Sequence, residues 1–314
     1  MRAVTSNDRG AVISIGTFDG VHLGHQRILA EVRRLASELE QVAVAYAFPI
    51  PPRRQLMDEP GRFLLLPERV KSRLLLDTVD RVVRAPFAEI RDYPPDRFVE
   101  RILVERLNAA SIVVGPSFRF GARRAGDPTV LRALGGRYGL SVTVVPPVSI
   151  CGETVNSTRI RALVKDGDVD VATALLGRPP ILIGEVASDE RVGRALGYPV
   201  GNLEVDPNVL LPDHGVYAAR AFVAGDPSPR SALLYVGIRP TITPPPATPR
   251  CEVLLLDPPG AESLDVCIEV QLLERMREDL RFPSLDDLRR QIDCDVARGR
   301  KILARHPSSV PIAG

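Results

Sequence analysis

The sequence predicts two domains: an α/β domain built on a parallel, Rossmann-like sheet, then an antiparallel β-barrel with a C-terminal helix. A chain of 314 residues is long enough for about two domains. Strand-like and helix-like segments alternate up to residue 178, as in parallel α/β sheets. Beyond it, strand-like segments follow one another with Gly/Pro turns and almost no helices. Because Pro179 and Pro180 mark the change, we expect domains at 1–180 and 181–314.

The elements of the first half follow from the spacing of apolar residues. Short apolar runs, several of them ended by Gly or Pro, predict strands at 11–16, 42–48, 79–87, 111–116 and 140–148. Helical spacing predicts helices at 23–38, 67–78, 95–107 and 127–138. In such a sheet, nucleotide-type ligands bind at the carboxyl ends of the strands.

The second half contains five predicted strands and one long helix. The strands are expected at 181–187, 215–223, 231–237, 250–256 and 264–273. The Pro-rich tract 241–250 predicts a loop. The final helix is expected at 284–305, with one apolar face made of Leu285, Leu288, Ile292, Val296 and Ile302.

The amino-acid composition excludes several classes of protein. The net charge is +2, and aromatic residues are only 5% with no Trp, which argues against a nucleic-acid partner. No apolar stretch reaches the roughly 18 residues of a membrane span, and the N-terminus has no signal-peptide core. The four cysteines are scattered without C-x-x-C spacing. We therefore expect a cytoplasmic protein, a monomer or weak homo-oligomer, with no zinc and no membrane partner.

The strongest motif is G-T-F-D-G-V-H-L-G-H-Q at 16–26, between a predicted strand and a predicted helix. His22 and His25 are three positions apart, so both imidazoles lie on one side of the first helical turn. Gly24 has no side chain, which lets a phosphate approach the backbone, and a helix N-terminus favours anions. The motif predicts a polyphosphate site with two donors aimed at developing charge. The alternative is a pair of surface histidines at a helix start.

A second segment, N-S-T-R-I-R at 156–161, precedes a predicted helix. Ser157 and Thr158 are good helix N-caps, and the arginines after them are long enough to reach phosphate oxygens. Taken alone, the segment is better described as a plain cap followed by solvated arginines. Together with the histidine motif in the same domain, it favours phosphate binding.

These motifs resemble the nucleotidyltransferase superfamily and, within it, the bacterial bifunctional riboflavin kinase/FMN adenylyltransferases, or FAD synthetases. The resemblance extends over nearly the whole chain. It includes, besides 16–26 and S-T-R-I-R, the segments V-G-P-S-F-R-F-G (114–121) with Gly126-Asp127, V-P-P-V (145–148), L-L-G-R-P (175–179), D-E-R-V-G-R-A-L-G-Y-P (189–199), V-G-I-R-P-T (236–241), C-E-V-L-L-L-D (251–257) and F-P-S-L-D-D-L (282–288).

The resemblance implies that the first domain joins FMN to ATP, giving FAD and pyrophosphate. His22 and His25 would stabilise the α-phosphate region and the leaving pyrophosphate. The other implied contacts are ATP and phosphate ligands at Gly16, Phe18, Asp19, Gly24, Ser157, Thr158 and Arg159, and a flavin/nucleotide pocket at Gly115, Ser117, Phe118 and Asp127. For Phe118, core packing is an equal alternative.

Two positions of the first domain depart from the family pattern. Ile50 stands where the family usually has a histidine, in the segment A-F-P-I-P at 47–51. Ser117 stands where an acidic or amide residue is common. Both changes leave the histidine motif intact, so we expect weaker binding rather than lost chemistry, or a related acceptor or nucleotide as substrate.

The second domain resembles riboflavin kinase, which phosphorylates riboflavin to FMN with ATP and Mg²⁺. Glu252 matches the catalytic base, although a strand glutamate is by default a solvated residue. The implied ATP and flavin contacts are Gly193, Arg194, Gly197, Pro199 and Asn202, with Asn202 also a Mg²⁺ ligand.

The metal motif P-T-A-N of this family reads Pro199-Val200-Gly201-Asn202 here. Valine has no oxygen for a hard cation, so Val200 removes one ligand. A second departure lies at 264–266, where L-D-V replaces L-Y-G. The kinase is therefore expected to be impaired or retuned. The alternatives are a FAD synthetase with a non-catalytic flavin-binding barrel, and a non-catalytic flavin- or nucleotide-binding regulator.

Overall fold

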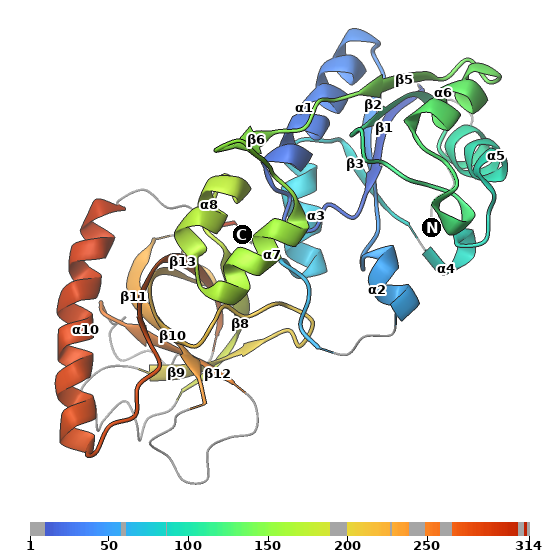
Figure 1. Ribbon diagram of the computed structural model, residues 1–314. Helices are drawn as coiled ribbons and strands as arrows, with labels where there is room; N and C mark the ends of the chain where they lie inside the picture. The colour runs from blue at the N-terminus through green and yellow to red at the C-terminus, as the bar shows by residue number, and fades with distance from the viewer. Residues whose placement is uncertain are drawn as a thin grey trace. The chain divides into compact units, whose positions relative to one another are not determined.

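The chain folds into two compact units (Figure 1). The computed structural model describes residues 10–57, 61–85, 87–188, 200–226, 228–238, 249–257, 266–306 and 311–312. The first unit comprises Met1–Pro60 and Glu68–Asn156, and the second comprises Gly61–Pro67 and Ser157–Gly314. These units describe packing; the division of functional domains at residue 180 stays a prediction.

The first unit is built on a five-stranded parallel sheet in the order β3-β2-β1-β4-β5. Its strands are β1 (Ala11–Gly16), β2 (Val42–Ala47), β3 (Arg81–Arg84), β4 (Ala109–Val114) and β5 (Ser141–Val144). Every one of them lies within or close to a predicted strand. A short hairpin, β6 (Ser149–Ile150) with β7 (Glu153–Thr154), was not predicted.

Helices connect these strands, as right-handed crossovers between parallel strands require. They are α1 (Leu23–Glu38), α2 (Pro52–Met57), α3 (Glu68–Leu76), α4 (Phe87–Ile90), α5 (Pro95–Phe98) with its π-helical continuation η1 (Val99–Arg106), the 3₁₀ turn η2 (Ala122–Arg124) and α6 (Pro128–Gly136). The four helices predicted from sequence are confirmed; the shorter α2 and α4 were missed because one turn carries little periodicity.

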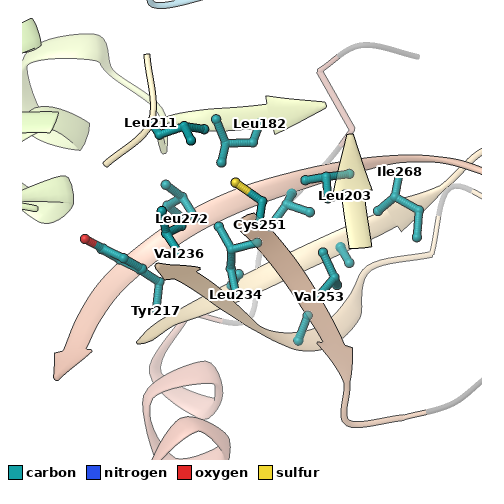
Figure 2. Close-up of a cluster of buried hydrophobic side chains, with 14 of the residues drawn as sticks. Leu182, Leu203, Leu211, Tyr217, Leu234, Val236, Cys251, Val253, Ile268 and Leu272 are labelled. Atoms are coloured by element: carbon teal, nitrogen blue, oxygen red, sulfur yellow. The ribbon is translucent and has the colours of Figure 1, made fainter. Parts of the chain in front are cut away.

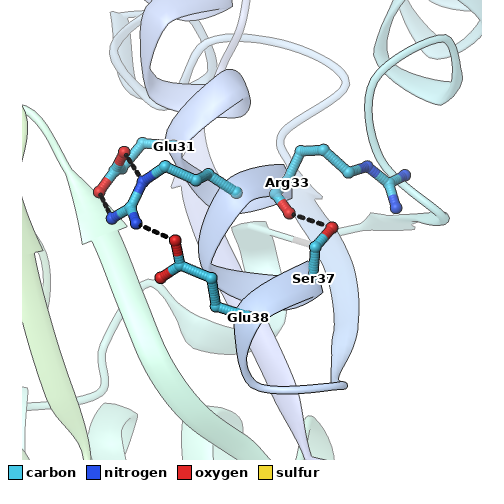
Figure 3. A network of polar contacts seen from close by, with 5 residues as sticks. Glu31, Arg33, Ser37 and Glu38 are labelled. Atoms are coloured by element: carbon cyan, nitrogen blue, oxygen red, sulfur yellow. Dashed lines mark hydrogen bonds and ion pairs between the residues drawn. The ribbon is translucent and has the colours of Figure 1, made fainter.

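Helix α1 shows why this sequence forms a helix. Leu29, Val32 and Ala36 form its buried face against the sheet. On the exposed side, Arg34 bonds both Glu31 and Glu38, three and four residues away (Figure 3). Such pairs each add a few tenths of a kcal/mol to a helix, so apolar burial supplies most of its stability.

The second unit begins with two helices and continues as a β-barrel. Among the described residues, the closed barrel runs β10-β11-β12-β9-β8-β13. Its elements are α7 (Ser157–Asp166), α8 (Val169–Leu176), β8 (Ile181–Ser188), β9 (Val200–Val205), β10 (Gly215–Val223), β11 (Arg230–Gly237), β12 (Arg250–Leu255), β13 (Cys267–Glu278) and α10 (Leu285–Arg305). The barrel and its terminal helix are confirmed.

The sixth strand, β9, was not predicted. Gly201 and Asn202 have low strand propensity, and the run is short. Backbone pairing with both β8 and β12 makes it a strand nevertheless. The loop predicted at 241–250 lies outside the described residues except for Pro249 and Arg250, and Arg250 already begins β12.

Alternate residues of the barrel strands face two different apolar layers. The interior contains Leu182, Leu203, Leu234, Cys251 and Val253 (Figure 2). An outer layer against α10 contains Val200, Leu254, Val296, Ile302 and Leu303. The prediction for the α10 face was wrong at Leu285, which is 74% exposed because it occupies the first helical position, next to the Ser284 cap.

Within the described residues, no helix combines the length and the apolar character that a membrane span needs.

Candidate functional sites: a stacked histidine pair and a barrel carboxylate

The histidine motif lies at the carboxyl end of the central strand. β1 ends at Gly16, and α1 begins at Leu23 with His22 as its N-cap. β1 pairs with β2 on one side and with β4 on the other. Strand order reverses at this point, and open parallel sheets typically bind ligands at the carboxyl ends of the strands where this happens.

His22 and His25 form one unit. Their rings stack with centroids 3.6 Å apart and planes 18° apart. The backbone N–H of His25 donates to His22 Nδ1 at 3.3 Å. Because that nitrogen accepts, neutral His22 carries its proton on Nε2. His22 is 5% exposed, so its position is fixed by the surrounding chain.

Gly24 has a specific part in this arrangement. A Cβ at this position would lie 3.1 Å from Cε1 and Nδ1 of the His22 ring. A side chain at this position would press on the His22 ring, so glycine gives the N-cap imidazole room over the first turn of α1. The approach of a phosphate to the Gly24 backbone stays a prediction.

The loop 17–22 has a strained backbone. Phe18 has φ 52°, and the β-branched Val21 has φ 39°. Left-handed backbone at such residues costs on the order of 1–3 kcal/mol each and is concentrated at functional sites. The turn is held by the Val21 N–H on the Phe18 carbonyl, and by the Gln26 amide on the Val21 carbonyl at 2.9 Å. Gln26 belongs to the motif, but sequence reasoning assigned it no role.

Phe18 packs against the pair, and the next residue, Asp19, is buried as well. Phe18 is 1% exposed, and its ring meets His25 edge-on with centroids 5.3 Å apart. A Cβ on Gly16 would touch that ring at 3.3 Å, so Gly16 makes room for it. Asp19 is also buried, at 2%.

The segment after β4 combines exposed and structural residues. Gly115 follows the strand, and Ser117 is exposed. Phe118 stacks on Phe120 with centroids 5.6 Å apart and packs against the sheet core. Asp127 is the N-cap of α6: its Oδ1 accepts the N–H groups of Thr129 and Val130 at 2.9 Å. These bonds lower the pKa of Asp127.

Ser157, Thr158 and Arg159 form the first turn of α7 rather than preceding a helix. They belong to the second unit, whereas the histidine pair belongs to the first. The structure gives Arg161 a packing role: its guanidinium lies 3.9 Å from the Phe63 ring centroid and donates to the Phe63 carbonyl.

The second site lies on two neighbouring barrel strands. Glu252 on β12 is directly opposite Asn202 on β9, so both side chains share one barrel face. The next pair on that face is Leu254 and Val200, which lie in the layer against α10. Glu252 therefore stands at the edge of this apolar layer, half-buried. Its neighbour Cys251 points into the barrel, where burial raises the thiol pKa to about 12.

Asn202 has the properties of a cation ligand. Its Oδ1 is buried and accepts no hydrogen bond from the described residues. An unsatisfied buried oxygen is costly, and a bound cation removes that cost. Val200, on the same face, is 6% exposed and purely apolar. The residues present thus fit Mg²⁺ at Asn202 but not at Val200. Gly193, Arg194, Gly197, Pro199, Leu264 and Asp265 lie outside the described residues.

Family comparisons agree with this division into two sites. The FAD synthetase family model matches residues 4–159, and the riboflavin kinase family model matches residues 176–303. The bifunctional riboflavin kinase/FMN adenylyltransferase of Pseudomonas fluorescens is 35% identical over 297 residues, 94% of each chain. Its namesake from Haemophilus influenzae is 32% identical and covers 92% of each chain.

A solved structure has the same fold. A crystal structure titled as a macrolide-efflux protein from Streptococcus pneumoniae superposes with a TM-score of 0.80, at 27% identity and 95% coverage of each chain. Both family models and near full-length relatives match this chain in one order, with the histidine pair in the first half and Glu252 in the second. The chain therefore belongs to the bifunctional riboflavin kinase/FMN adenylyltransferase family.

Proposed function

We propose that this protein makes FAD from riboflavin in two ATP-dependent steps, one on each half of the chain. The observation that carries the proposal is the stacked His22–His25 pair at the end of β1, inside the matched FAD synthetase segment. The substrates are riboflavin, FMN and ATP, and the product is FAD.

In the adenylyl transfer, an FMN phosphate oxygen attacks the α-phosphorus of ATP. The new P–O bond forms in line as the bond from the α-phosphorus to the bridging oxygen breaks, and pyrophosphate leaves. No covalent enzyme intermediate is needed, so the protein contributes position and charge stabilisation. The imidazoles of His22 and His25 donate to the oxygens on which negative charge grows.

The remaining contacts of this half are proposed from the family motif. Ser157, Thr158 and Arg159 hold phosphate oxygens, while Gly115, Ser117 and Phe118 border the flavin and nucleotide. Asp127 contributes through the α6 N-terminus that it caps. Ile50 is 41% exposed, so it offers an apolar surface to a ligand where the family has an imidazole.

In the kinase step, Glu252 takes the proton of the ribityl hydroxyl, whose oxygen attacks the γ-phosphorus of ATP and releases ADP. Mg²⁺ neutralises phosphate charge when bound, and Asn202 is the residue that would hold it. Val200 contributes no oxygen, so the ion has one protein ligand fewer and is held less rigidly. We therefore propose a kinase slower than the adenylyl transfer.

A second candidate function is FAD synthesis with a barrel that binds flavin without phosphorylating it. The observation in its favour is the burial of Val200 in the apolar layer. A purely regulatory, non-catalytic role has no comparable support, because the histidine pair is complete.

The purified chain tests these proposals directly. Incubated with FMN, ATP and Mg²⁺, it should release FAD and pyrophosphate, resolved by chromatography. With riboflavin in place of FMN, it should form FMN slowly. FAD from FMN but no FMN from riboflavin supports the second candidate, and absence of both products contradicts the proposed function. A cytoplasmic location, the lack of nucleic-acid or membrane partners, and a monomer or weak homo-oligomer stay predictions.

A further inference from the structure

One charged side chain in the core of the first unit has no part in the proposed chemistry. Lys71, on α3, is 2% exposed. Burying an ammonium group is costly unless it is paired, so a lysine at this depth needs hydrogen-bond acceptors and a carboxylate around its ammonium. An apolar side chain of the same length would avoid that cost.

The Lys71 ammonium donates two hydrogen bonds to backbone carbonyls and forms an ion pair with one carboxylate. Nζ lies 2.7 Å from the carbonyl oxygen of Phe48, 3.0 Å from that of Pro49 and 2.8 Å from Glu68 Oε2. Glu68 is on the same helix and balances the charge. The two carbonyls are the first after β2, so the lysine fixes the point at which the chain leaves the sheet.

The same loop is joined to the histidine motif. The N–H of Phe48 donates to the carbonyl of Gly16 at 3.0 Å. Gly16 is the last residue of β1 and the start of the strained loop that ends at His22. One peptide segment thus links the Lys71 ammonium to the backbone of the catalytic loop. Farther along, the Gln55 amide holds the Ile50 carbonyl at 3.0 Å.

We propose that Lys71 is a positioning residue for adenylyl transfer: it anchors the loop after β2 and, through Phe48, fixes the start of the loop that carries His22. The kinetic test of this inference rests on the proposed function, because it measures FAD formation. Lys71 touches no substrate; it acts through two backbone carbonyls. Its loss should therefore misplace the histidine pair in a protein that still folds.

The test compares Lys71→Met with Lys301→Met, the same chemical change at an exposed position of α10. FAD formation is measured at a temperature at which both variants are fully folded. Loss of bonds to a charged donor predicts a kcat/KM lower by roughly 10-fold or more in Lys71→Met, and no change in Lys301→Met. A lower unfolding midpoint with wild-type kcat and KM would show a merely structural role and overturn the proposal.

Hydrogen exchange provides a readout that does not depend on activity. Peptides spanning 16–22 and 48–57 should both lose protection in Lys71→Met, because the two loops share the Phe48–Gly16 bond. Unchanged protection of peptide 16–22 in Lys71→Met overturns the positioning role of Lys71, whatever the activity of the wild type. If the wild-type protein makes no FAD, that result alone contradicts only the proposed function.

If Lys71→Met does not fold, Gln55→Ala replaces it. Gln55 is exposed, and its side-chain amide donates to the Ile50 carbonyl, so its removal leaves the core intact. Loss of one hydrogen bond predicts a fall in kcat/KM of roughly two- to tenfold, together with faster exchange at 48–57. Wild-type values for both measurements would contradict the anchoring role of the loop.

Discussion

The ring of His22 is fixed by its own helix cap. Its Nδ1 accepts the His25 N–H at the start of α1. The cap therefore orients the imidazole that we propose as a donor to phosphate. His25 is fixed differently, by stacking on the His22 ring and by a T-shaped contact with Phe18. Each histidine therefore holds the other in place.

For single residues, we first predict the effect of His25→Ala. The variant removes one donor from the transition state and leaves the His22 cap in place, since that bond uses the backbone of residue 25. FAD formation from FMN should fall by a factor on the order of 10²–10³, measured as kcat under saturating substrates. His306→Ala, at an exposed position after α10, is the control and should match wild type. Near-normal turnover in His25→Ala would exclude this site.

Helix α10 is attached to the barrel by a buried ion pair as well as by its apolar face. Arg277 on β13 contacts Asp295 on α10 at 2.8 Å, with side chains 16% and 6% exposed. Both carboxylate oxygens of Asp295 accept from Arg277 Nε, and Gln291 also donates to one of them. Removing one partner of such a pair leaves a buried charge without compensation.

We therefore expect Arg277→Met to lower the free energy of unfolding by about 3 kcal/mol or more. Arg290→Met is the matched control, because Arg290 pairs with Asp287 at the surface, where its side chain is 76% exposed. That exposed pair should contribute less than about 1 kcal/mol. Urea denaturation of both variants measures the difference; equal losses would mean that the Arg277–Asp295 pair does not hold the helix.

The Asp127 cap of α6 predicts a pH dependence. The pKa of Asp127 is lowered in the folded protein, first by the Val130 N–H and then by that of Thr129. The unfolded state thus binds the proton more readily, and the cap stabilises the fold above the unfolded pKa near 4. This stability is lost as the pH falls through the folded pKa.

Asp127→Asn keeps an oxygen acceptor for the cap but does not titrate. Urea midpoints at pH 7 and pH 3 should therefore differ less in Asp127→Asn than in wild type. The same pH dependence in both proteins would show that the carboxylate charge adds nothing to the cap.

At the scale of the whole molecule, the chain carries two separate constellations. His22 and His25 lie in the first unit, and Asn202 and Glu252 lie in the second. A change in the barrel should therefore alter one reaction without the other. Val200 is the position where this independence is easiest to test.

Val200→Thr with Gly201→Ala restores the family metal motif, and Val200→Thr alone restores only its hydroxyl. The new hydroxyl supplies an oxygen beside Asn202, so riboflavin phosphorylation should accelerate while adenylyl transfer from FMN stays constant. The single variant controls for the added methyl at Gly201, which is opposite Val253 of the barrel interior. The steady-state rates of both reactions are measured for each variant. If riboflavin phosphorylation is equally fast in wild type and in the variants, Val200 does not impair the kinase.

The sequence by itself determined the class of each half, because hydrophobic periodicity reports directly on which face of an element is buried. It located β1, α1 and five of the described barrel strands to within about five residues, and the histidine motif marked the candidate first site. It missed β9, whose Gly201 and Asn202 disfavour a strand, because pairing with β8 and β12 is a long-range effect that local propensity does not contain.

The tertiary structure alone decided how the site residues are used. Local spacing placed His22 and His25 on one turn, but only the packed loop shows their rings stacked, with Gly24 making room for them. Local spacing gave Lys71 no role, because its partners Phe48 and Pro49 are more than 20 positions away. A side chain's chemistry is determined by the neighbours that folding brings to it, and those neighbours come from distant parts of the chain.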